Sequence, residues 1–300
     1  MLQTHFGEIA ALLTACFWTV TALSFEQAGK RIGSLAVNWI RLLLGLIFLS
    51  VFTWISRGML LPLDASVHAW LWLGLSGLIG FVIGDIMLFQ AFVQIGSRIS
   101  MLIMALVPPI TTLISWLLMG EKLSGLDLIG MALTVGGIGL VVLDQPAGGK
   151  KVKLSHPISG ILFAVGGAAG QAIGLVFSKY GMEDYSAFPA TQIRIIVGLA
   201  GMTLLYFPLK AWGKVGVAFR NKKGILLTTN GAFWGPFLGV SFSLLAVQHT
   251  LAGVASTIMA IVPVLIIPPA VLFLKEKVTT KEICGAVVAV IGVGMLFLQG

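Results

Sequence analysis

The sequence predicts an all-α integral membrane protein of ten transmembrane helices, arranged as two inverted repeats of five helices. Three observations carry this prediction: the composition, a series of ten apolar runs, and an internal repeat. The chain has 300 residues, of which 58% are hydrophobic and 10% are charged, and its mean hydropathy is +1.02. Soluble globular proteins have about 25% charged residues, so the composition excludes an ordinary soluble domain.

The ten apolar runs are bounded by polar residues, glycine or proline, and each approaches the roughly 20 residues that one helical crossing needs. The runs are too long for membrane strands and lack their alternating pattern, so we expect no strands. The linker QPAGGKKVKLSHP at 145–157 divides the chain into units 1–144 and 158–300. The expected helices are 7–26, 34–56, 69–92, 98–119, 124–144, 158–180, 186–209, 223–248, 252–274 and 279–298.

The two units repeat one another. Residues 103–108 read IMALVP and residues 258–263 read IMAIVP, an offset of 155 residues. The same offset aligns Gly84 with Gly239, and an offset of 153 aligns Arg41 with Arg194. Matches in one order along the chain indicate an internal duplication. Because five crossings are an odd number, the second copy enters the membrane from the opposite face, which is the architecture of alternating-access carriers.

The repeated motif contains a proline in the middle of an apolar run. Pro108 and Pro263 each remove a backbone hydrogen bond and are expected to kink their helix. Carbonyls freed at membrane depth are tolerated where they face protein or a watery cavity. The two prolines therefore either shape helix packing or line a central pathway.

Several motifs together resemble one family. Trp18 lies in the first helix, Asn38-x-x-Arg41 begins the second, and a V-P…G-E-K pattern closes the fourth, repeated as V-P…K-E-K in the second unit. This pattern resembles the EamA branch of the drug/metabolite transporter superfamily over essentially the whole chain. The resemblance implies a ten-helix carrier of small metabolites, often an amino-acid exporter, with its pore among helices 3, 4, 8 and 9 and their partners. It says almost nothing about the substrate.

Charged side chains well inside the predicted spans are Arg41, Asp85 and Arg194, and Asp85 is the only buried acid we expect. A charge at the bilayer centre costs at least ~2.5 kcal/mol, so each should have a partner or water. Arg41 and Asp85 lie at similar depth and can pair. The pair is either a structural brace between the second and third helices, or Asp85 is a proton-coupling carboxylate with a shifted pKa.

Arg194 differs from its repeat mate Arg41, because the position that matches Asp85 in the second unit is Val240. An arginine without a carboxylate partner can hold a substrate carboxylate bidentately. It can also reach Glu183 or Asp184 in the preceding loop, or cap a backbone carbonyl. All of these uses stay open at this stage.

Uncharged side chains complete the predicted cavity. Small-molecule sites are mostly apolar with a few placed polar groups, although the same side chains also serve hydrogen bonding between helices. Methionines of the fourth and ninth helices are either core filler or an adaptable pocket wall. The neutral candidates are Trp18, Trp39, Gln90, Gln171, Gln192, Trp234 and Ser241.

The function that these features favour is secondary active transport of small metabolites, most of all amino acids or similar zwitterionic or anionic solutes. No nucleotide-binding motif is present, so active transport would use an ion gradient, for example of protons. An exporter of organic cations is the alternative within the class; a passive channel or an intramembrane enzyme is the alternative outside it. An enzyme would need a convergent catalytic set, which the sequence lacks.

We expect no cofactor. We also expect no metal site and no disulfide, because Cys16 and Cys284 lie in apolar runs without a second cysteine nearby. The partners expected are a small solute and the lipid bilayer, with no nucleic acid, and the chain can be a monomer or a homodimer. The net charge of +8 is attributed to loop lysines at an anionic membrane face.

Two observations predict opposite orientations of the chain in a cell membrane. Fourteen Lys and Arg residues lie in the loops of one face and three in those of the other, which places both termini outside the cytoplasm. The family resemblance implies cytoplasmic termini.

Overall fold

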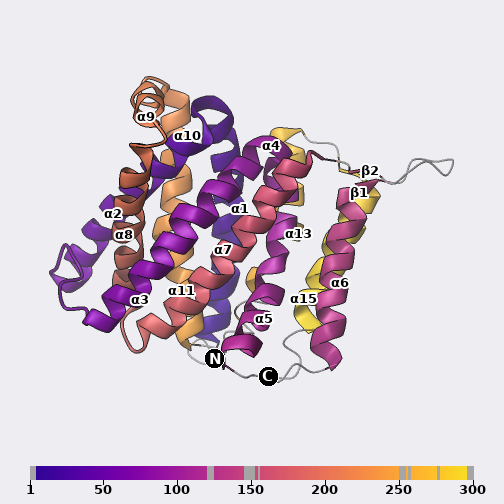
Figure 1. Cartoon of the computed structure of the whole chain (residues 1–300), viewed down its shortest axis with the longest axis horizontal. Helices are drawn as coiled ribbons and strands as arrows, with labels where there is room; N and C mark the ends of the chain where they lie inside the picture. Colours follow the sequence, from indigo (N-terminus) through magenta and orange to yellow (C-terminus); the bar gives the residue numbers. More distant parts are fainter. Residues whose placement is uncertain are drawn as a thin grey trace.

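The computed structural model describes residues 5–119, 125–144, 153–154, 156–249, 255, 258–275 and 278–295, and nearly all of them are helical (Figure 1). The first half contains α1 (Phe6–Ile32), α2 (Ser34–Arg57), α3 (Val67–Gly77), the π-helix η1 (Leu78–Gly84), α4 (Asp85–Ile103), the 3₁₀-helix η2 (Met104–Leu106), α5 (Val107–Met119) and α6 (Gly125–Val142). The second half contains α7 (Ile158–Met182), α8 (Ala187–Tyr206), α9 (Trp212–Ala218), α10 (Lys222–Ala232), the π-helix η3 (Phe233–Gly239), α11 (Val240–His249), α13 (Val262–Leu265), α14 (Ile267–Leu274) and α15 (Thr280–Met295).

The helices form ten crossings in the part of the chain that the structure describes. Six helical segments are long and apolar enough to span a membrane, and one of them, Val67–Ile114, has 48 residues. That segment turns back at Gly96, whose φ of 79° interrupts α4. It therefore makes two crossings, the first through α3 and η1 and the second through η2 and α5. The fold is that of an all-helical membrane protein.

The two halves have opposite directions. The start of α1 and the end of α15 lie at the same end of the bundle, and α1 runs from that end to the other (Figure 1). The helix α7, which begins the second half, starts at the far end and runs back. Each half makes an odd number of crossings, so the second repeat is inverted relative to the first, as predicted.

Paired close contacts reveal the pseudo-twofold relation between the repeats. A methyl group at Gly45 of α2 would lie 3.0 Å from Cβ of Pro236 in η3. A methyl group at the matching Gly198 of α8 would lie 3.1 Å from Cβ of Phe81 in η1. Phe81 and Pro236 are themselves related by the offset of 155 residues. The same contact is therefore made twice, with the roles of the two halves exchanged.

The outer pair of helices, α6 and α15, repeats this exchange. A methyl group at Gly137 would lie 2.6 Å from the carbonyl oxygen of Gly285, and one at Gly292 would lie 2.6 Å from that of Gly130. Small residues at these points let the two backbones approach closely, which is how membrane helices associate.

Some boundaries differ from the prediction. The helix α1 continues to Ile32, six residues beyond the expected end, and stops at Gly33, where φ is 83°. The short helix α9 was not predicted. Two-residue strands β1 (Leu143–Asp144) and β2 (Lys153–Leu154) pair antiparallel at the ends of the linker, where no strand was expected. Local hydropathy cannot place a helix end that is set by a positive φ at one glycine.

Candidate functional site

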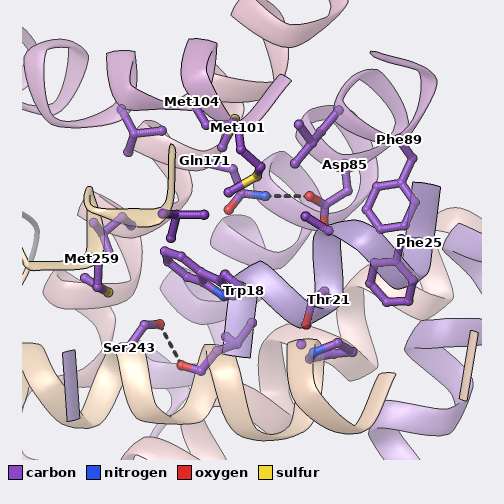
Figure 2. Close-up of a pocket in the computed structure, with 18 of the residues that line it drawn as sticks. Trp18, Thr21, Phe25, Asp85, Phe89, Met101, Met104, Gln171, Ser243 and Met259 are labelled. Carbon is purple, nitrogen blue, oxygen red and sulfur yellow. Dashed lines mark hydrogen bonds between the residues drawn. The ribbon is translucent and has the colours of Figure 1, made fainter. Parts of the chain in front are cut away.

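A cavity of about 170 Å³ lies between the two repeats and is lined by residues from both (Figure 2). This is room for several waters or a small solute. Most of its wall is aromatic, aliphatic or methionine, and its polar groups are few. The lining residues of the first half are Trp18, Thr21, Ala22, Phe25, Arg41, Phe81, Asp85, Leu88, Phe89, Phe92, Met101, Met104, Ala105, Val107 and Pro108. Those of the second half are Gln171, Leu175, Arg194, Gly235, Pro236, Val240, Ser243, Met259, Ala260, Val262 and Pro263.

Two π-helices contribute to this wall at equivalent positions. The helices η1 and η3 are each 7 residues long, and both their first and last residues are related by the repeat offset. The amide of Asp85 donates to the carbonyl of Gly80, and that of Val240 donates to the carbonyl of Gly235, each five residues back. Pi-helical turns are rare and occur often at functional sites. Here they carry Phe81 and Pro236 to the cavity.

The charged centre of the cavity is the Arg41–Asp85 pair. Arg41 Nη2 donates to Asp85 Oδ2. Gln171 Nε2 donates to Asp85 Oδ1 at 2.6 Å (Figure 2). Arg41 Nε also donates to Asn38 Oδ1 at 2.8 Å. Arg41 is 3% exposed and Asp85 is 4% exposed. Both carboxylate oxygens of Asp85 thus accept a hydrogen bond from a neighbouring side chain.

Arg194 is the second cation of the cavity and is 4% exposed. Its Cζ lies 4.7 Å from the centroid of the Phe81 ring, and Arg41 Cζ lies 5.6 Å from the same ring, so Phe81 contacts both guanidinium groups. The buried Nε of Arg194 has no hydrogen-bond partner among the described residues. The cavity lining thus contains two basic side chains and one acidic side chain.

The loop acids do not pair with Arg194 in the part of the chain that the structure describes. Glu183 Oε1 lies 3.5 Å from His68 Nε2, at the end of α7, and Asp184 is exposed. The sequence left open an ion pair between Arg194 and Glu183 or Asp184. The described residues do not form this pair.

Seven of the residues singled out from the sequence meet in this cavity, among the positions described. They are Trp18, Arg41, Asp85, Pro108, Gln171, Arg194 and Pro263. Both prolines lie just after an interruption of their helix: Pro108 follows η2, and Pro263 is the second residue of α13. Met101, Met104 and Met259 also line the wall (Figure 2).

Two other candidates link helices outside the cavity wall. Trp39 Nε1 donates to Thr203 Oγ1 at 3.0 Å, joining α2 to α8. Gln90 Oε1 accepts from Ser34 Oγ at 2.7 Å, joining α4 to α2. The sequence left two uses open for these side chains, substrate contact and hydrogen bonding between helices. Both side chains form hydrogen bonds between helices.

The remaining three candidates also lie away from the lining. Gln192 Nε2 donates to Ser50 Oγ at 2.9 Å and to the carbonyl of Leu60 at 2.7 Å. Trp234 packs its ring on Phe17, with centroids 5.3 Å apart. Ser241 is buried, and its Oγ has no partner among the described residues.

The expectation that Asp85 is the only buried acid is wrong, because Glu26 is also completely buried. Glu26 Oε2 accepts from the amide of Ser97 at 2.7 Å, and Oε1 pairs with Lys30 of the same helix. The acid therefore fastens the turn at Gly96 to α1. Because the first helix was predicted to span 7–26, Glu26 fell on its last residue, at the expected edge of the span. The Lys four residues later was the available signal of a longer helix.

Aromatic lining residues such as Phe25, Phe81 and Phe89 were also missed. In a chain with 18 phenylalanines, an apolar residue that faces a cavity looks the same in sequence as one that faces lipid. The charged residues stand out because they are rare, and no comparable signal marks the aromatic wall.

Comparisons with known proteins agree with this architecture. The EamA-like transporter family model matches residues 5–143 and again residues 158–298. A protein of Clostridium kluyveri, described as an uncharacterized transporter, is 24% identical over 289 residues, covering 95% of this chain and 91% of its own. One protein of known crystal structure has the same fold, with a TM-score of 0.63 at 17% identity, covering 98% of this chain and 96% of its own. The two family matches together span almost all of the sequence, and the chain belongs to the EamA-like transporter family: it is a multi-pass membrane transporter and not an enzyme.

Proposed function

We propose that this transporter moves small solutes that carry a carboxylate, such as amino acids, by alternating access through the cavity between its repeats. In this proposal Arg194 binds the carboxylate. The observation that carries it is the buried guanidinium of Arg194, which has an unpartnered Nε among the described residues and lies at the cavity wall. A buried polar group without a partner is costly, and a planar anion such as a carboxylate fits a guanidinium bidentately.

The rest of the wall supports a solute with an apolar part. Phe25, Phe89, Met101 and Met259 line the cavity around the charged centre. Methionine adapts to differently shaped ligands, so one wall can accept more than one side chain. Asp85 acts as a brace in this proposal, because Arg41 and Gln171 occupy its two oxygens.

Transport of organic cations is disfavoured by the same charges. A cation would need a free carboxylate in the cavity, whereas the lining holds two arginines and the acid is paired. We further propose that an ion gradient drives transport, that the repeat units are 1–144 and 158–300 joined by 145–157, and that the protein resides in the cell membrane.

The test is uptake of a labelled amino acid mixture into proteoliposomes under an imposed pH gradient. Arg194→Gln should abolish accumulation, while the matched variant Arg31→Gln, which changes an exposed arginine at the end of α1, should transport normally. Full transport by a folded Arg194→Gln protein overturns the carboxylate role. Absence of any amino acid transport in the wild type overturns the substrate class, and organic cations are then tested in the same vesicles.

A further inference from the structure

The segment from Phe207 to Lys223 lies at the end of the bundle opposite the start of α1 (Figure 1). It is rich in Lys and Arg, and we call it the basic surface. It contains α9 and its flanking turns, which connect α8 to α10. No Asp or Glu occurs between Asp184 and Glu276 in the sequence. The cations of this basic surface are all exposed: Lys210, Lys214, Arg220, Lys222 and Lys223.

These five cations have no carboxylate partner within the described residues. Acid–base pairs do occur elsewhere on the molecule, for example between Arg57 and Asp64 and between Arg98 and Glu282. Within the described residues, no acidic side chain balances the positive charge of the basic surface. This charge attracts anions from outside the chain.

Exposed apolar side chains alternate with the cations. Phe207 is 65% exposed, Val217 is 66% exposed and Phe219 is 53% exposed. Such residues beside cations are typical of a segment at the membrane interface, where apolar groups enter the acyl boundary and Lys or Arg meet the headgroups. The apolar side chains distinguish this surface from a site for a small inorganic anion, which has no apolar group for them to contact.

The opposite side of α9 is fixed to the bundle. Val215 and Ala218 are 3% and 2% exposed. Trp212 packs on Trp39 of α2 with ring centroids 5.3 Å apart, and on Tyr206 at 5.9 Å. The basic surface is thus held on a packed base, and its cations keep a defined place relative to the spanning helices.

We propose that the segment Phe207–Lys223 binds the headgroups of anionic phospholipids, with Phe207, Val217 and Phe219 in the acyl boundary and the five cations at the phosphates. Lys and Arg near a membrane surface attract anionic lipid, and this attraction is screened by salt. The binding surface is separate from the transport cavity and does not depend on the substrate proposed above.

The experiment measures lipid retention by the full-length protein in detergent. The protein is mixed with equal amounts of phosphatidylglycerol and phosphatidylcholine of identical acyl chains, repurified, and its bound lipids are quantified by mass spectrometry. We expect the wild type to retain several-fold more phosphatidylglycerol at low salt. Changing all five cations to Gln should bring the ratio near one, whereas changing the four lysines to Arg should preserve it.

Matched single variants localise the effect. Lys214→Gln on α9 should lower the ratio measurably, while Lys179→Gln, an exposed lysine on α7 outside this surface, should leave it unchanged. If the variant with all five cations changed to Gln does not fold, the wild type is measured in about 0.5 M salt. Screening should then remove its preference for phosphatidylglycerol. A wild-type ratio near one at low salt, a ratio unaffected by salt, or an unchanged ratio in the folded five-fold variant overturns the proposal.

Discussion

Arg41 of α2 and Asp85, the first residue of α4, form an ion pair 44 residues apart in sequence, and both side chains are almost completely buried. The second repeat has the arginine, Arg194, but Val240 at the position of the acid. Arg41 therefore has an ion-pair partner, whereas Arg194 has none among the residues that the structure describes. The cavity of a nearly symmetric protein becomes chemically asymmetric at this point.

Removing the acid of this pair should destabilise the protein strongly. Asp85→Asn leaves a buried charge on Arg41 without its counterion, which typically costs about 3–5 kcal/mol. We expect a clear drop in the melting temperature of the detergent-solubilised protein. The double variant Arg41→Met/Asp85→Leu should recover much of the loss, because it leaves no unpaired charge; equal melting temperatures for the double and single variants would contradict this account.

Supplying the missing acid should block the proposed substrate site. In Val240→Asp the new carboxylate occupies the repeat position of Asp85 and should pair with Arg194, so a substrate carboxylate loses its partner. Uptake of labelled amino acids should fall at least tenfold while the melting temperature stays similar. Val240→Asn has the same size without the charge and should transport better than Val240→Asp; equal loss in both would point to packing instead.

The buried acid at the Gly96 turn should matter for stability. Glu26→Ala leaves the amide of Ser97 without its acceptor, at a cost of about 1–3 kcal/mol. Glu8→Ala changes a partly exposed acid at the other end of α1 and should have little effect. The comparison is made by thermal unfolding, and similar values for both variants would show that the turn does not depend on Glu26.

Adjacent glycines of α6 should respond differently to a methyl group. In Gly137→Ala the new Cβ would lie 2.5 Å from the backbone nitrogen of Ala289 in α15, whereas at Gly136 nothing lies within 4 Å. Gly137→Ala should lower the melting temperature and Gly136→Ala should not. A stable Gly137→Ala protein would mean that α6 and α15 separate more easily than their packing indicates.

Asp64, in the loop between α2 and α3, gives a prediction for acid pH. Burial raises the pKa of Asp64, but hydrogen bonds from Tyr185 and Arg57 outweigh it and hold the pKa below its ordinary value of 3.8. A carboxyl whose folded pKa is lowered stabilises the fold above its unfolded pKa, and this contribution is lost as the pH falls through the folded pKa. The melting temperature of the wild type should exceed that of Asp64→Asn near neutral pH, and the difference should shrink below about pH 4. A difference that is constant with pH would rule out this linkage.

The sequence predicted the membrane class, the crossings and the inverted repeat, because hydropathy and internal similarity accumulate over many residues. Helix ends and short helices were harder to predict, because each depends on a few residues. The end of α1 depends on the positive φ of Gly33, and the error there hid Glu26. The helix α9 is too short to give a hydropathy signal.

Within the candidate site, prediction succeeded where the residue type was unusual for its surroundings. Arg41, Asp85 and Arg194 are conspicuous in an apolar chain because a buried charge needs a reason. Trp39 and Gln192 were equally conspicuous as polar groups in a span, yet they join helices. Sequence cannot separate these uses, because the direction in which a side chain points depends on how its helix is rotated in the bundle.

The two π-helices also bear on the history of the chain. A π-helical turn arises when one extra residue is accommodated in an α-helix, and η1 and η3 have it at equivalent positions. Two independent insertions at equivalent positions require two events, whereas one insertion inherited by both halves requires a single event. A single insertion that preceded the internal duplication therefore accounts for both turns, which now border the cavity from both sides.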